Sequence, residues 1–311
     1  MSADFPEVVR IDALGDDMSL ARVVQLVLSA SVMMIVFSLG LQATTHDATY
    51  LFRQPRRLLK SLASMFIITP VVAAVLVQAL ELPLAVEITM IVIAMSPVPP
   101  ILPKKELAAG GVRSYALGLL VAAAVISVLF VPAAVELFEK IFKRPAEMSP
   151  FTIARIVISS VIGPLAVGLA VRHFWPGLAE RSAAPLSHLA TLLLIAALLP
   201  VQFTVVSAEI SLIGHGTLLV LTVFVVICLV AGALLGGPEL SDRIVLALST
   251  ASRHPGVAMA IVRANRPNQK LVLPAILLYL TVSTIVSGVF VVWLRRRNRA
   301  NEVDNRQSPA A

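Results

Sequence analysis

Two stretches decide the fold of this chain: Met95-Ser96-Pro97-Val98-Pro99-Pro100-Ile101-Leu102-Pro103 and Ser252-Arg253-His254-Pro255-Gly256. No α-helix continues through the four prolines of the first stretch, because each proline removes a backbone donor and clashes with the preceding turn. In the second stretch a charge, an imidazole, a proline and a glycine follow one another between two apolar runs. Each stretch therefore predicts a helix that is broken in its middle.

The composition places both broken helices in a membrane. Hydrophobic residues make up 58% of the 311 residues and charged residues only 14%, whereas a soluble domain has about 25% charged residues. A soluble enzyme is therefore excluded, and so are collagen-like, disordered and coiled-coil chains. The single cysteine, Cys228, rules out a disulfide framework or a cysteine metal site. We predict an all-α polytopic membrane protein with no metal site and no cofactor.

Charge-free runs around the two stretches predict nine membrane-spanning helices. Four runs have 20 to 24 residues, enough to cross about 30 Å of hydrocarbon at about 1.5 Å per residue: 23–45, 61–80, 114–135 and 271–294. Three further spans lie within 151–171, 182–208 and 210–238, and the broken helices, about 85–108 and 240–264, are the third and the eighth. Residues 1–22 are acidic and have no apolar core, so they predict an N-terminal tail and not a signal peptide.

The basic residues are divided unequally between the two faces of this predicted bundle. With nine crossings, 15 Lys and Arg residues lie on the C-terminal face and 9 on the N-terminal face, with Arg253 inside a span. The positive-inside rule then places the C-terminus in the cytoplasm and the N-terminus outside, in a bacterial inner membrane. The basic tail, residues 295–311, is interpreted as a cytoplasmic anchor beside the lipid bilayer and not as a nucleic-acid-binding arm.

The two breaks occupy equivalent places along the chain. Pro97 lies 74 residues after Val23, where the first span starts, and Pro255 lies 73 residues after Ser182, where the sixth span starts. Because these spans are five apart, the two units run in opposite directions, as in inverted-repeat transporters, whose substrate site lies where the broken helices meet. This predicts a first repeat of four spans (23–137) and a second of five (138–294). The alternative is a pair of unrelated proline kinks.

The sequence around these elements resembles the bile acid:sodium symporter family. The similar segments are 36–41 (the family's F-x-x-G-L), 50–56 (its short amphipathic helix), Ser96-Pro97 (its Cys-Pro), 107–111 (its L-A-x-G) and 249–260 (its second crossover helix). The resemblance runs from about residue 26 to 294. It implies an inverted repeat that lacks its first helix, a core domain sliding against a panel domain, and secondary transport of an organic anion by alternating access.

The sodium ligands that the resemblance would imply are replaced in this chain. Positions that match the family's first sodium site include Leu102 and Pro103, and the ligands of the second become Ser249, Arg253 and Met65. Because sodium needs several oxygen ligands and a guanidinium repels it, we predict that both sodium sites are lost. Na+ and H+ both stay open as coupling ion, and a sodium-coupled symporter with altered ligands is the alternative function.

A charge between two apolar runs marks the expected substrate site. Such residues line a cavity or pair with another charge, so we predict that Arg253 binds the anionic substrate; the alternative is a structural ion pair. The half-helix after the second break offers amides that favour an anion. His254 and Gly256, with Ser96 and Pro97 of the first break, complete the predicted substrate site.

Charged residues at the end of the third span form a second group of candidates. Lys104 and Lys105 stand beside Glu106. One interpretation is ordinary positive-inside charge. The other is that one lysine reaches into the substrate cavity, with Glu106 as its partner, and takes the electrostatic role of the missing sodium ions.

Two further function classes compete with a carrier. A membrane enzyme would need a nucleophile with a base or a metal cluster, and neither H-E-x-x-H nor G-x-S-x-G occurs, so we predict that the protein is not an enzyme. An uncoupled anion channel would also lack sodium sites, and saturable, exchangeable uptake separates a carrier from it. The substrate, the direction of transport and the oligomeric state are not fixed by the sequence, a monomer being one option.

Overall fold

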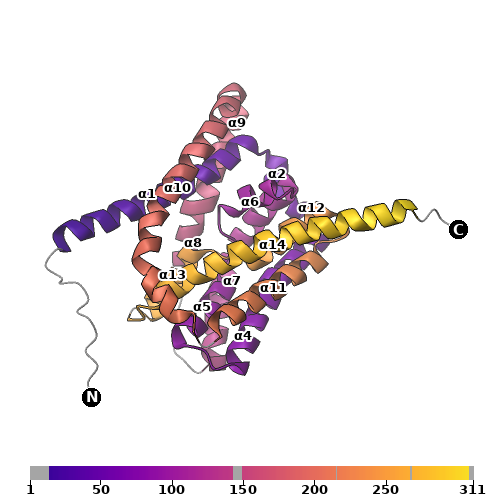
Figure 1. Ribbon diagram of the computed structural model, residues 1–311. Coiled ribbons are helices and arrows are strands. Elements are labelled where there is room, and N and C mark those ends of the chain that lie inside the picture. Colours follow the sequence, from indigo (N-terminus) through magenta and orange to yellow (C-terminus); the bar gives the residue numbers. More distant parts are fainter. Residues whose placement is uncertain (1–13, 143–148, 215, 267, 308–311) are drawn as a thin grey trace, which may run out of the picture.

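A computed structural model describes residues 14–142, 149–214, 216–266 and 268–307, and within these ranges every regular element is a helix (Figure 1). The helices are α1 (Leu14–Gln42), α2 (Thr45–Thr49), α3 (Pro55–Ala63), α4 (Thr69–Ala79), α5 (Leu84–Met95), α6 (Leu102–Ala108), α7 (Arg113–Phe142), α8 (Pro150–Val157), α9 (Gly163–Phe174), α10 (Pro176–Leu212), α11 (Thr217–Leu235), α12 (Leu240–Ala251), α13 (Pro255–Asn265) and α14 (Val272–Gln307). A 3-10 turn, η2 (Leu51–Arg53), and two π-helical turns, η3 (Ser64–Ile68) and η4 (Ile158–Ile162), connect some of them.

Eight helical segments of the described chain are long and apolar enough to cross a membrane, which confirms a multi-pass membrane protein. They are Arg22–Gln42, Pro55–Ala79, Arg113–Phe142, Pro150–Phe174, Pro176–Leu212, Thr217–Leu235, Leu240–Asn265 and Val272–Asn298. Each corresponds to one predicted span. The predicted third span consists of the shorter apolar helix α5 and the short α6, so the count of nine crossings stays a prediction.

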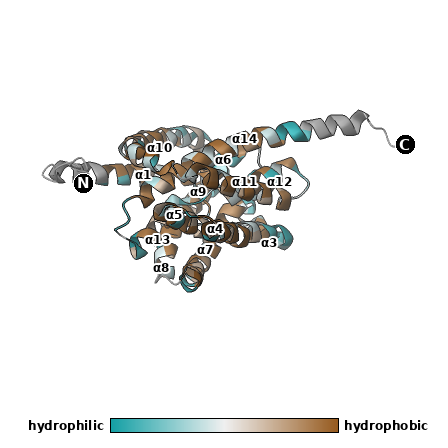
Figure 2. Ribbon diagram, turned by 60° about the horizontal axis from the view of Figure 1, so that its bottom comes forward, coloured by the Kyte–Doolittle hydropathy of each residue, from teal (hydrophilic) through white to brown (hydrophobic). Residues whose placement is uncertain are grey.

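Both terminal helices extend into regions that the sequence predicted as tails. Helix α1 begins at Leu14, inside the predicted N-terminal tail 1–22, and α14 continues to Gln307, inside the predicted tail 295–311. The tails were predicted from their low apolar content. A helix can continue through polar residues, because its hydrogen bonds are made by the backbone. Hydropathy therefore locates the membrane part of a helix and not its ends. Figure 2 shows this for α14, whose brown hydrophobic part gives way to teal before the C-terminus.

Both predicted helix breaks are present. Between α5 and α6 the chain is non-helical around Pro97–Pro100, and between α12 and α13 the residues Ser252–His254 have no regular structure. The prolines explain the positions: Pro103 and Pro255 each lie in the first turn of the following helix, where a missing N–H costs no intrahelical hydrogen bond.

The helices form two groups. Helices α1, α9 and α10 pack mainly on one another, and Figure 1 shows α9, α10 and α1 along one side of the molecule. Glycines allow α1 and α9 to approach closely: a Cβ atom on Gly168 would lie 2.5 Å from the carbonyl oxygen of Phe37 and 2.8 Å from the Cα atom of Gly40. No larger residue fits there without moving a backbone.

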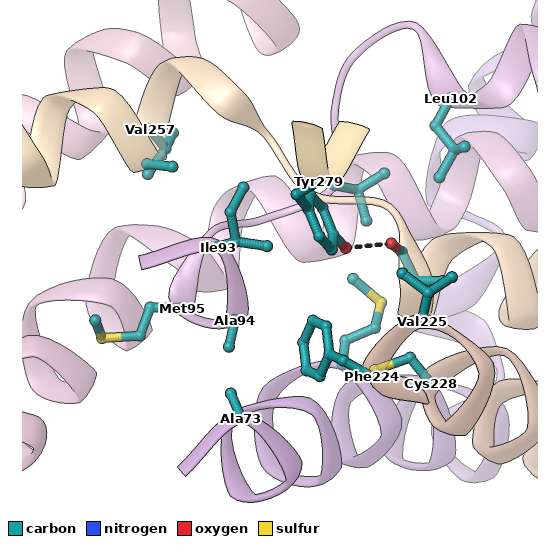
Figure 3. Packing of buried hydrophobic residues seen from close by; sticks show 14 of the residues in the cluster. Ala73, Ile93, Ala94, Met95, Leu102, Phe224, Val225, Cys228, Val257 and Tyr279 are labelled. Atoms are coloured by element: carbon teal, nitrogen blue, oxygen red, sulfur yellow. Dashed lines mark hydrogen bonds between the residues drawn. The ribbon is translucent and has the colours of Figure 1, made fainter. Parts of the chain in front are cut away.

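The second group contains both broken helices and the main hydrophobic cluster. Residues from α4, α5, α7, α11, α12, α13 and α14 bury one another in this cluster, part of which Figure 3 shows around Phe224 and Tyr279. A smaller cluster joins the two groups, with Ile35 and Leu39 of α1 and Ala190 of α10 against Leu117 of α7. The described contacts are thus denser within the second group than between the groups.

Candidate functional site

The two breaks touch each other, although more than 150 residues separate them in the chain. The backbone N–H of His254 donates to the carbonyl of Pro97 at 2.8 Å. The Arg253 guanidinium donates through Nη1 to the carbonyl of Ser96 at 3.3 Å. The predicted site residues Ser96, Pro97, Arg253 and His254 therefore lie together.

The π-helical turn η3 contributes a third segment to this site. Atom Nη2 of Arg253 donates to the carbonyl oxygen of Met65 at 2.9 Å and to the hydroxyl of Thr69 at 2.7 Å. A π turn bonds each carbonyl to the N–H five residues later, and the residue five after Met65 is Pro70, which has no N–H. The Met65 carbonyl is therefore left without a helical partner, and the guanidinium supplies one.

Arg253 is completely buried, with 0% of its surface exposed, and oxygen atoms surround its charge. A fourth bond, from Nη2 to the Thr250 carbonyl at 3.0 Å, returns to the end of α12. The ion pairs of the described chain are Arg57 with Asp242 and Lys140 with Glu136, so no carboxylate pairs with Arg253 there. The guanidinium joins the turn η3 and both breaks. Direct contact of Arg253 with a substrate stays a prediction.

His254 caps the second half-helix. Its Nδ1 atom accepts from the Gly256 N–H at 3.1 Å, while its Nε2 atom is buried and has no hydrogen-bond partner among the residues described. The amide that was expected to face an anion is thus used by the imidazole in this conformation. Such N-caps satisfy one of the amides that a helix start leaves free.

Helix α14 holds the end of α12 in place. The hydroxyls of Tyr279 and Ser283 both donate to the Ala251 carbonyl, at 2.5 and 3.1 Å, and the first bond is the dashed line in Figure 3. Nothing in the sequence distinguishes Tyr279, Ser283, Thr69 or Thr250, because single hydroxyl-bearing residues occur in many apolar spans. The only signal was that Thr69 precedes a proline.

The predicted pairing of Glu106 with a neighbouring lysine is wrong. Glu106 is 1% exposed, and its Oε1 atom accepts from the Ser249 hydroxyl at 2.6 Å. Lys104 instead donates to the Ser187 carbonyl and the Thr191 hydroxyl of α10, at 3.3 and 2.5 Å. Residues two apart on a helix point in widely different directions, so Lys104 reaches the first helix group while Glu106 faces α12.

The other positions matched to sodium ligands offer no side-chain oxygen around Arg253. Leu102 and Pro103 are buried apolar residues at the start of α6. The hydroxyl of Ser249 donates to the Glu106 carboxyl. Met65 takes part through its backbone alone.

Two of the cavities beside the broken helices include a residue next to a break, Met95 or Ser252. One, of about 290 Å³, lies between α6, α12 and α14 and includes Lys105, Ser252 and Ser287 in its lining. The other, of about 100 Å³, lies between α5, α7 and α13 and includes Glu87 and Arg266. Arg253 lines neither of them.

Comparison with known families agrees with the resemblance seen in the sequence. The model of the Sodium Bile acid symporter family matches residues 30–211, which is more than half of the chain and includes the first break. The match ends before the second break, so Arg253 and Ser249 lie outside it. No curated protein gives a significant match.

Proposed function

Because the chain belongs to the Sodium Bile acid symporter family, we propose that it is a secondary transporter that moves an organic anion by alternating access and does not use sodium. The proposal includes nine spans arranged as the repeats 23–137 and 138–294, in a bacterial inner membrane. Its N-terminus lies outside and its C-terminus in the cytoplasm. No enzymatic step, cofactor or nucleic acid takes part.

The observation that carries the sodium-independent part is the position of the Arg253 guanidinium. In transporters with broken helices, unwound backbone carbonyls coordinate the coupling cation. Here the carbonyls of Met65, Ser96 and Thr250 and one hydroxyl face a cation that is part of the protein. We interpret Arg253 as a permanent replacement for a bound ion.

The charge of Arg253 also opposes sodium binding nearby. Two unit charges about 4 Å apart at an effective dielectric constant near 20 repel by about 4 kcal/mol. This corresponds to roughly thousandfold weaker binding of sodium at about 1.4 kcal/mol per tenfold.

The two helix groups support the alternating-access part of the proposal. The group α1, α9 and α10 meets the rest through a small apolar cluster and through Leu212 of α10, which belongs to the main cluster. Hydrogen bonds of Lys104 to α10 and of Arg113 to the carbonyl of Gln42 also cross this boundary. Contacts of α10 with α14 and of α1 with η4 add to these. The contacts between the groups are still fewer than those inside either group, so this boundary is where we place the sliding motion. Both helix breaks would move with the second group as one unit, since His254 and Arg253 bind them together.

A proton is the second candidate for the coupling ion. The observation in its favour is the buried carboxyl of Glu106, which accepts a hydrogen bond from Ser249 and forms no ion pair within the described residues. A carboxyl in a membrane span is typical of proton pathways.

Uptake into vesicles tests the proposal. A ligand-stabilisation screen of the purified protein against organic anions, with and without sodium, supplies the substrate. We expect saturable, exchangeable uptake that persists when choline replaces sodium, and a pH gradient tests the proton as coupling ion. Arg253→Ala should lower uptake far more than Arg243→Ala, whose side chain donates to the Ala233 carbonyl and to no other described residue. A saturable requirement for sodium would reject the sodium-independent mechanism, and non-saturable flux would indicate a channel.

A further inference from the structure

The cavity between α6, α12 and α14 has a polar wall of which the site described above uses only Ser283. Ser283, Thr284, Ser287 and Gly288 of α14 all line it. Positions three and four apart on a helix lie on one face, so Ser283 and Ser287, with Thr284 and Gly288 beside them, form a strip along this span. Ser252, directly before Arg253, lines the cavity from the second break.

The cavity contains one buried hydroxyl without a partner and one exposed lysine. The Ser287 hydroxyl is buried, with the residue 8% exposed, and has no hydrogen-bond partner within the part of the chain described. Buried hydroxyls without partners are rare and costly. Lys105 also lines the cavity. It is exposed and, unlike Lys104, forms no hydrogen bond or ion pair with a described residue, so its ammonium group is open to a ligand.

The chemistry of the lining defines the ligand. A single ammonium group balances one negative charge, and hydroxyls both donate and accept hydrogen bonds. Leu102, Leu248 and Val291 supply an apolar surface. A volume of about 290 Å³ is at the lower end of the roughly 300–1,000 Å³ typical of small-molecule sites.

We propose that this cavity binds a small organic monoanion, a short-chain hydroxylated monocarboxylate. Its carboxylate lies at Lys105, and its hydroxyl groups bond to Ser287, Thr284 and Ser252. The inference rests on the proposed function only in identifying this ligand as the transported anion; binding itself does not depend on transport.

The cavity also explains how a ligand would act on the helix breaks. Ser283 binds the Ala251 carbonyl, and Ser252 follows that residue directly. A ligand held by Ser252 and Ser287 therefore contacts both α14 and the chain just before Arg253. Such contacts can favour one arrangement of the break over another.

Binding to the purified full-length protein tests the proposal. Lactate and glycerate are the monocarboxylate probes, citrate is the multiply charged probe, and cholate is the bulky one, all compared at equal ionic strength by calorimetry. We expect the monocarboxylates to bind most tightly. Lys105→Met should weaken them by about tenfold to a hundredfold, the usual effect of a lost charge-assisted hydrogen bond. Lys60→Met, which removes an exposed lysine of α3, is the control and should not change the affinity.

Gly288→Leu is a second, independent variant. It should leave the fold intact, because a Cβ atom on Gly288 meets nothing within 4 Å. The added side chain enters the cavity and should abolish binding. Unchanged affinity in both Lys105→Met and Gly288→Leu, or preferred binding of citrate or cholate, would overturn the proposal. If the monocarboxylates bind but are not taken up, the proposed transport function is rejected and the proposed binding site is supported. If Gly288→Leu takes up the substrate with an unchanged KM, the transport function is supported and the cavity is rejected as the substrate site.

Discussion

Replacing Arg253 by glutamine should convert this protein into one that sodium stabilises. The guanidinium donates to four oxygens: the carbonyls of Met65, Ser96 and Thr250 and the hydroxyl of Thr69. A glutamine amide has two donors, so at least two of these buried acceptors lose their bond. At about 1–3 kcal/mol for each, the variant should be less stable by about 2–6 kcal/mol without sodium.

Sodium should return part of this stability, because the oxygens left by Arg253 can coordinate it. If the variant binds sodium with a Kd of about 10 mM, about 100 mM sodium stabilises it by about 1.4 kcal/mol. The same site with the guanidinium present would be about a thousandfold weaker, so the wild-type protein should gain essentially nothing. For a chain of this size the gain corresponds to a rise in Tm of roughly 2–4 °C.

Thermal unfolding in detergent, in sodium chloride against choline chloride, measures the effect. Arg253→Met is the matched control, since it removes the charge but adds no oxygen, and it should respond less to sodium than Arg253→Gln. If sodium raises the Tm of the wild-type protein as much as that of Arg253→Gln, the guanidinium does not replace an ion. Unchanged stability of Arg253→Met without sodium would show that its hydrogen bonds are unimportant.

Three further predictions concern other parts of the molecule. Ser249→Ala removes the hydrogen bond to the buried Glu106 carboxyl and should lower the free energy of unfolding by about 1–3 kcal/mol, whereas equal thermal stability would refute the importance of this contact. Lys104→Met removes the bonds from α6 to α10, so amide hydrogen exchange near Thr191 should become faster, and unchanged exchange would contradict a link between the helix groups. Reporter tags at Ser2 and Ala311 should appear outside and in the cytoplasm respectively, and two cytoplasmic tags would mean an even number of spans.

The sequence predicted those features that depend on local chain chemistry. Four prolines near Pro97 and the group around Pro255 exclude a continuous helix wherever they occur, so both breaks could be located before their contact was seen. The contact between Arg253 and Met65 could not be predicted, because its acceptor is a backbone carbonyl, which every residue has. Its availability depends on a π turn ahead of Pro70, and a π turn has no strong sequence signal.

Side-chain directions were harder to predict than helices. The sequence placed Lys104 and Glu106 together, but only the start of α6 at Leu102 fixes which face each occupies. Likewise the hydroxyls of α14 form a strip only when helical phase and the neighbouring α6 and α12 are both known. Composition identified the spans, while packing determined what each polar residue contacts.

A cation that is covalently part of the transporter has an energetic consequence. In the mechanism that we propose, the Arg253 charge takes the place of a sodium ion and is never released on the other side, so a sodium gradient does not drive the substrate. If no proton is co-transported, each transport event then moves one net negative charge across the membrane. Entry of this charge into a negative interior costs about 2.3 kcal/mol per 100 mV of membrane potential. With a negative interior of that size, the anion would reach equilibrium at a roughly fiftyfold higher concentration outside. On this proposal, a guanidinium buried where the helices break favours export of an anion, or its exchange for another, over accumulation in the cell.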